Sequence, residues 1–97
     1  MYALVLIRYR RPIEDVLPAT PDHRSYLNTL KDRGVLLASG PFDPRVGGAL
    51  LLRLPEENIT AALDRIRDDD PYWQRGLANY ELLPWAPTIG IEGLAQL

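Results

Sequence analysis

The chain has 97 residues, of which 46% are hydrophobic and 25% charged, and a formal net charge of −2 at pH 7. This length suits one domain with one hydrophobic core, because a second core would be too small to be stable. The slightly acidic balance lacks the basic surface that is typical of proteins binding nucleic acid or anionic membranes. We therefore expect neither nucleic acid nor a membrane as a partner.

The chain contains no Cys and a single His. The lack of Cys excludes disulfides, thiol nucleophiles and thiolate metal sites. A transition-metal site usually needs several nitrogen or sulfur ligands, which one His cannot supply. The apolar opening, residues 1–7, is too short to span a membrane or to form a secretion signal. We expect a cytoplasmic protein without metal or cofactor.

The first half of the chain predicts a strand, a loop and a helix. Residues 2–9 are rich in β-formers, and the polar, proline-containing residues 10–19 predict a loop. Thr20 is expected to be the N-cap of a helix that has Pro21 at its first position and ends before Gly34. Its apolar stripe consists of His23, Tyr26, Leu27 and Leu30.

The second half predicts two strands, a helix and a fourth strand. The strands lie at 35–39 and 49–54, with Gly40-Pro41 ending the first of them and a hairpin connection following. The helix after residues 55–57 ends at Asp70, because Pro71 disfavours helical geometry in the residue before it. The fourth strand occupies 77–83. We expect one domain with its core at about 2–86 and a C-terminal extension at 87–97.

This element order, βαββαβ, predicts an α+β ferredoxin-like fold with a four-stranded antiparallel sheet. Right-handed crossovers place both helices on one face of that sheet. The other face would then carry apolar side chains that nothing covers. Because exposed apolar faces of this kind usually pack against a partner, we expect a sheet-to-sheet homodimer.

The fold predicts that His23 and Asp70 meet. The start of the first helix, the end of the second helix and the hairpin all lie at one end of this topology. His23 is four residues before Leu27, and Asp70 is four residues after Ile66, so both point toward the sheet. Three carboxylates at 68–70 would also oppose the helix macrodipole, and such a broken local rule often marks a site.

The chemistry of this pair suggests a general base and its orienting group. The positive end of a helix and partial burial favour a neutral imidazole at His23, which can accept a proton near pH 7. Asp70 would fix the tautomer and stabilise the imidazolium that forms. The simpler alternatives are a space-filling His at a helix terminus and an Asp that bonds local backbone amides.

Other residues at the same end of the fold are candidates for holding a substrate. The candidates are Ser39, Gly40, Pro41, Tyr72 and, for an anionic group, Arg8. Each also has a purely structural interpretation, such as a backbone-bonded strand serine, a strand terminator, a packing aromatic or a strand-end surface arginine. Asp43 and Arg45 are expected to be surface residues of the hairpin tip.

The sequence resembles the YciI-like (YCII-related) family. The resemblance is carried by His23 with its following helix, LLASGP at 36–41, Gly47-Gly48, DPYWQRG at 70–76 and Trp85. It implies a dimeric α/β-barrel with a His–Asp site, to which His23 and Asp70 correspond. The best-understood activity of that family is dehydrochlorination of a chlorinated hydroxyquinol-type aromatic. The short hairpin PFDPRVGG and the extension after Trp85 depart from some members.

These observations favour a cofactor-independent enzyme of the lyase or isomerase type that acts on a small cyclic or aromatic molecule. The first alternative is a non-catalytic module that binds a small molecule or supports assembly on the same dimer. A second is a cofactor-free monooxygenase of the related dimeric barrel class.

Overall fold

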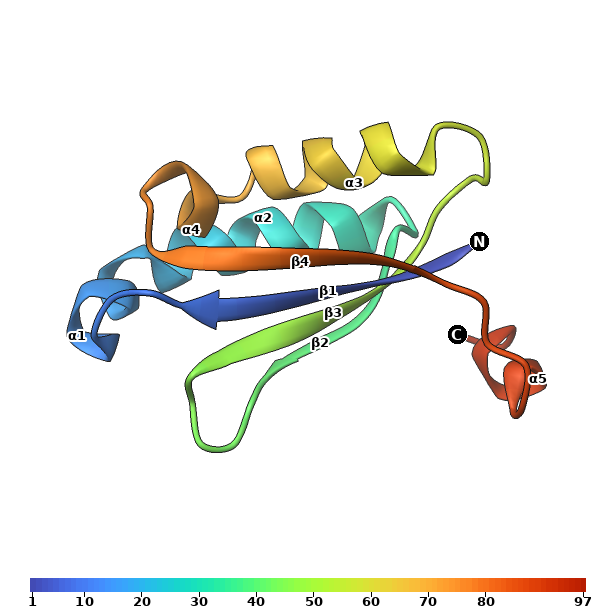
Figure 1. Ribbon diagram of the computed structural model, residues 1–97, viewed down its shortest axis with the longest axis horizontal. Coiled ribbons are helices and arrows are strands. Elements are labelled where there is room, and N and C mark those ends of the chain that lie inside the picture. Colours follow the sequence, from blue (N-terminus) through green and yellow to red (C-terminus); the bar gives the residue numbers. More distant parts are fainter.

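The computed structural model describes residues 1–97 and has the predicted ferredoxin-like architecture. Four antiparallel strands pair in the order β2-β3-β1-β4. Their bounds are β1 Tyr2–Tyr9, β2 Leu36–Pro41, β3 Gly47–Arg53 and β4 Ala78–Trp85. The helices α2, Thr20–Asp32, and α3, Ile59–Asp68, lie side by side on one face of this sheet (Figure 1). The prediction of the fold is confirmed.

Alternation along the strands separates the two faces of the sheet. In β1, Ala3, Val5 and Ile7 are buried against the helices, whereas the residues between them are less buried. The helices meet these side chains with Leu27 and Leu30 of α2, and with Leu63 and Ile66 of α3. Fully burying one such aliphatic side chain contributes about 1.5–3 kcal/mol, so this layer anchors both helices to the sheet.

The segment between β1 and α2 is not the loop that the sequence predicted. It forms a short helix α1, Ile13–Val16, and a 3-10 turn η1, Leu17–Ala19, that run directly into α2. Val16 and Ala19 are buried there, and their packing stabilises turns that would not persist alone. The Thr20 N-cap prediction is also wrong, because Ala19 occupies that position and already has helical backbone angles.

The β2–β3 connection is tighter than predicted, because Gly40 and Pro41 belong to β2 and Gly47 to β3. Gly47 passes so close to β1 that a Cβ atom there would lie 1.9 Å from the carbonyl oxygen of Ile7. Any larger residue would push the two backbones apart. This glycine therefore sets how closely the hairpin approaches β1.

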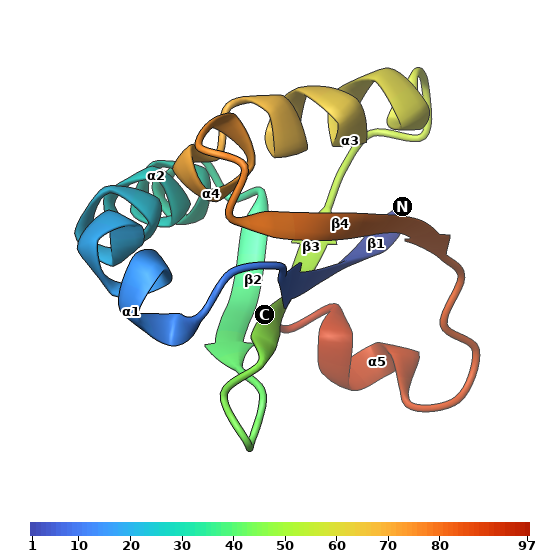
Figure 2. The same cartoon turned by 60° about the vertical axis from the view of Figure 1, so that its left-hand side comes forward.

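The C-terminal residues form a short helix α5, Ile91–Leu94, in the extension where no element was predicted. Figure 2 shows α5 on the side of the sheet away from α2 and α3. The Arg53 guanidinium donates to the carbonyl oxygens of Leu94 and Leu97, at 2.9 and 3.4 Å, and thereby ties the tail to β3. None of the helices has the length and apolar character that a membrane crossing requires.

Candidate active site

Asp70 begins a helix and does not end one. Helix α3 stops at Asp68, and the extended backbone of Asp70 precedes a second short helix, α4, Pro71–Gln74. The Asp70 Oδ1 accepts a hydrogen bond of 3.0 Å from the backbone N–H of Tyr72, which makes Asp70 the N-cap of α4. The predicted conflict with the macrodipole is therefore wrong for this residue, since a carboxylate at a helix N-terminus is favourable.

Helix α4 then turns the chain sharply into β4. The N–H of Gly76 donates to the carbonyl of Trp73, and the N–H of Leu77 donates to that of Tyr72. These two bonds make the Schellman termination, which needs a left-handed residue, and Gly76 supplies it with a φ of +67°. Asp70 and Tyr72 are thus held between a cap on one side and a fixed turn on the other.

The predicted meeting of His23 and Asp70 is present in the structure. The Nδ1 atom of His23 lies 2.7 Å from the Oδ1 atom of Asp70, and the two residues are 9% and 1% exposed. Because an ionised carboxylate only accepts, we assign the proton of this bond to Nδ1. The other nitrogen, Nε2, then carries a lone pair.

Three further side-chain contacts fix α2 against the α3–α4 segment on both sides of this pair. The Tyr26 hydroxyl donates to the Ile66 carbonyl at 2.7 Å, and Arg75 donates to Asp22 at 2.6 Å. The hydroxyls of Thr20 and Tyr72 are also 2.7 Å apart and buried. The separation of His23 and Asp70 is therefore held by a line of contacts along α2.

Tyr72 forms the wall beside the imidazole. Its ring stacks on that of His23 with 3.9 Å between centroids and 10° between planes, and Tyr9 meets it edge-on. Burial raises the pKa of Tyr72 above its ordinary value, although the hydrogen bond with Thr20 lowers it in part. The phenol is therefore neutral at physiological pH.

Tyr80 of β4 lies behind Asp70 and was not singled out from the sequence. Its buried hydroxyl and the Asp70 Oδ2 are both without a hydrogen-bond partner. The pKa of Tyr80 is raised strongly, first by burial and next by the Asp70 carboxylate, so the two groups are neighbours although their geometry falls short of a hydrogen bond. The far side of the carboxylate is thus closed by a neutral phenol.

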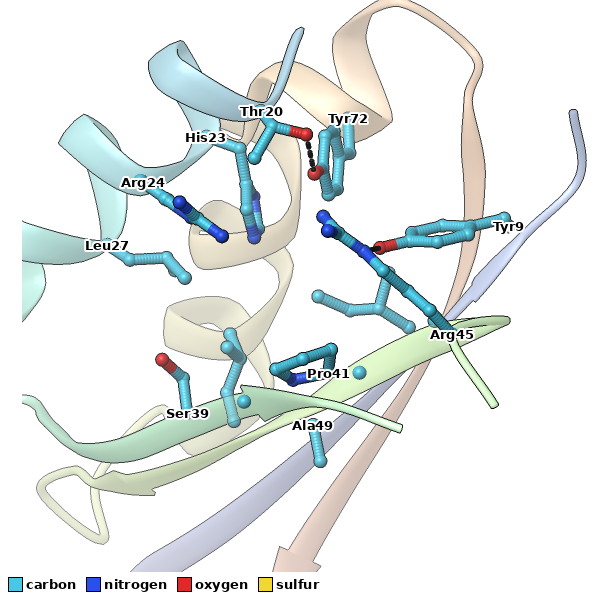
Figure 3. A pocket seen from close by; sticks show the side chains of 15 residues that line it. Tyr9, Thr20, His23, Arg24, Leu27, Ser39, Pro41, Arg45, Ala49 and Tyr72 are labelled. Atoms are coloured by element: carbon cyan, nitrogen blue, oxygen red, sulfur yellow. Dashed lines mark hydrogen bonds between the residues drawn. The ribbon is translucent and has the colours of Figure 1, made fainter. Parts of the chain in front are cut away.

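A cavity of about 270 Å³ opens in front of His23, between α2 and the β2–β3 hairpin (Figure 3). The predicted residues His23, Ser39, Gly40, Pro41 and Tyr72 line it. Asp70 does not reach the cavity and lies behind His23. Arg8 is outside the cavity too, since it is exposed and its guanidinium lies 6.0 Å from the centre of the Phe42 ring.

Four polar lining residues were missed by sequence reasoning: Tyr9, Thr20, Arg24 and Arg45. Arg24 follows His23 directly, and this adjacency was a usable signal. Arg45, expected to be a surface residue, folds back so that its Nε donates to the Tyr9 hydroxyl at 3.3 Å. No local pattern marks that contact, because its partners are 36 residues apart. No group of three or more His, Cys, Asp or Glu side chains gathers where it could hold a metal ion.

Comparison with known proteins assigns the chain to a family. A search of curated protein sequences finds no significant match. Among solved structures, the fold is similar to that of 5-chloro-2-hydroxyhydroquinone dehydrochlorinase from Burkholderia phenoliruptrix AC1100, which was determined in complex with 2,5-dihydroxybenzoquinone. The TM-score is 0.74 at 20% identity, with 91% of this chain and 96% of that chain covered. The model of the YCII-related domain matches residues 1–86, and the chain therefore belongs to the YCII-related family.

Proposed function

We propose that this protein is a cofactor-independent enzyme of the lyase or isomerase type that moves a proton on a small cyclic or aromatic molecule. The observation that carries this proposal is the 2.7 Å contact between His23 and the buried Asp70, with the imidazole lining a cavity. The structural likeness to a dehydrochlorinase supports the same class of chemistry.

In the proposed reaction, Nε2 of His23 is the general base. It removes a proton from a hydroxyl or carbon of the substrate, and the electron pair released forms a new π bond. In an elimination, a leaving group such as chloride departs with its own bonding electrons. In an isomerisation, the imidazolium returns the proton to another atom. Asp70 stabilises the imidazolium and keeps Nε2 toward the cavity.

The other lining groups position the substrate in this proposal. The Ser39 hydroxyl is a donor for a substrate oxygen, the Tyr72 ring forms a side wall, and the extended backbone at Gly40-Pro41 forms the wall opposite His23. Gly40 leaves this wall open, because a Cβ atom there would meet nothing within 4 Å. The cavity, at about 270 Å³, is near the lower end of the roughly 300–1,000 Å³ typical of ligand sites, which favours a single-ring molecule.

The experiment is an assay of halide release and product absorbance with a panel of halogenated hydroquinones and lactones. His23→Ala and Asp70→Asn should each lower kcat by about 100-fold or more, the lower end of what acid–base catalysis contributes. Asp32→Asn is the matched control, since it alters an exposed carboxylate at the other end of the same helix, away from the cavity. Full turnover by both site variants would remove the pair from the mechanism.

We further propose that the working unit is a homodimer formed through the face of the sheet opposite α2 and α3. Leu4, Leu6, Leu51 and Leu83 lie in neighbouring registers on that face, and none of the four is fully buried in one chain. Leu51→Glu should yield a monomer in light scattering, whereas Thr60→Glu on the exposed side of α3 should leave the dimer intact. A wild-type chain that is monomeric at all concentrations contradicts this.

A further inference from the structure

Two arginines stand at the cavity without a carboxylate partner. Arg24 comes from α2 and Arg45 from the hairpin between β2 and β3. In the view of Figure 3 their guanidinium groups lie on either side of the His23 ring. Neither forms an ion pair, whereas Arg75 and Arg67 elsewhere on the surface are paired with aspartates.

The cavity is positively charged in a protein that is negatively charged overall. Its lining contains no Asp or Glu, while the whole chain has a formal net charge of −2. The carboxylate behind the lining, Asp70, is 1% exposed and bonded to His23. Two cations that converge on one concave surface without an acidic neighbour repel each other, and an anionic ligand relieves that repulsion.

The two guanidinium groups have free donors. The side chain of Arg24 makes no hydrogen bond within the chain, and that of Arg45 uses only its Nε atom, toward Tyr9. That hydrogen bond raises the pKa of Arg45 and orients its side chain. Each terminal NH₂ group is therefore available, and the planar fork of a guanidinium matches the oxygens of a carboxylate or an ionised phenol.

The remainder of the lining suits a small organic body. Ile7, Leu27 and Leu50 provide apolar contacts, and the glycine-rich backbone of β2 and β3 also lines the cavity. A bare inorganic anion would leave this apolar surface unused. The combination of an apolar interior and cationic mouth is that of a site for a small organic anion.

We propose that Arg24 and Arg45 form a two-guanidinium clamp that selects substrates carrying an anionic oxygen group on a single ring. This deepens the proposed function, on which it rests for the reaction but not for the binding. The clamp holds the anionic group at the cavity mouth and places the rest of the ring against the His23 imidazole. Arg24 and Arg45 are thus specificity-determining residues.

The test is a calorimetric binding series with benzoate and with 4-nitrophenol above and below its ionisation, alongside the neutral benzamide and nitrobenzene. The benzoate arm tests a carboxylate and the nitrophenol arm tests an ionised phenol. At least one anion should bind about tenfold more tightly than its neutral counterpart, and added salt should weaken its binding. Arg24→Gln and Arg45→Gln should each lower the affinity for that anion about tenfold, which is the effect of losing one charge-assisted contact.

The control is Arg65→Gln, which removes the same charge from the exposed surface of α3 and should leave binding unchanged. His23→Gln should retain the affinity for the anion and lose turnover. Failure of the clamp and failure of the proposed chemistry therefore give different results. Equal affinity for charged and neutral probes, unchanged affinity in both arginine variants, or no binding of either anion would overturn the clamp.

Discussion

The two walls of the cavity are built in different ways. We call Thr20, His23 and Tyr72, together with Asp70 behind them, the inner wall, and Ser39, Gly40, Pro41 and Arg45 the outer wall. Every inner-wall residue is less than 10% exposed, and its side chain is hydrogen-bonded within the chain. Every outer-wall residue is exposed, and Arg45 alone among them makes a side-chain hydrogen bond, of 3.3 Å. The geometry of the proposed proton transfer is thus fixed by packing, while the surface proposed to meet the substrate is exposed and has few side-chain hydrogen bonds.

The largest expected effect is on the inner wall. Asp70→Ala leaves the His23 Nδ1 and the Tyr72 N–H without their acceptor in a buried place. Losing one partner of a buried pair typically costs about 3–5 kcal/mol in the free energy of unfolding. Asp68→Ala, two residues earlier on the exposed surface, should change it by no more than about 0.5 kcal/mol. Urea unfolding of both variants measures this difference. Equal losses in the free energy of unfolding would show that the burial of Asp70 adds nothing to its contribution to stability.

The next largest effect is on the stability of the β2–β3 hairpin, which carries the outer wall. Gly47→Ala forces a Cβ atom into the β1 backbone, and overpacking of this kind costs about 1–3 kcal/mol or more. Gly40→Ala, on the neighbouring strand, meets no atom within 4 Å and should leave stability nearly unchanged. Thermal unfolding of the two variants distinguishes them. If Gly40→Ala proved the more destabilising, the description of the hairpin would be wrong.

A smaller effect separates the two tyrosines around the pair. Tyr72→Phe removes the buried hydroxyl contact with Thr20, which should cost about 1 kcal/mol. Tyr80→Phe removes a buried hydroxyl that has no partner, so its cost should be smaller or even negative. Chemical denaturation of both variants tests this. A larger loss for Tyr80→Phe would mean that its hydroxyl bonds to Asp70 Oδ2 in solution.

The smallest effect is a dependence on alkaline pH. Burial raises the pKa of Tyr72 and Tyr80 above the ordinary value of 10.0, so the folded chain retains these protons more tightly than the unfolded chain. Their contribution to stability is therefore complete below about pH 10 and is lost as the pH rises further. Urea midpoints measured across this range should fall, and less steeply in Tyr80→Phe. An identical slope in that variant would assign the effect to other groups.

The element order and the meeting of His23 with Asp70 were predictable, because strand alternation, helix periodicity and topology fix which ends of the elements coincide. The role of Asp70 was not, since an Asp followed by Pro can end one helix or begin another. Only packing of Tyr72 beneath α2 decides between them. Likewise, the turns at 13–19 depend on the burial of Val16. The position of Arg45 depends on a contact with Tyr9, which is far away in the sequence.

The central claim is that Asp70 holds His23 in one tautomer with Nε2 free toward the cavity. Nitrogen-15 NMR of the only histidine in the chain reports this directly. We expect a protonated, hydrogen-bonded Nδ1 and an unprotonated Nε2 in the neutral wild-type imidazole, with this preference weakened in Asp70→Asn. A proton on Nε2, or a tautomer mixture like that of free imidazole and unchanged by the substitution, would contradict it.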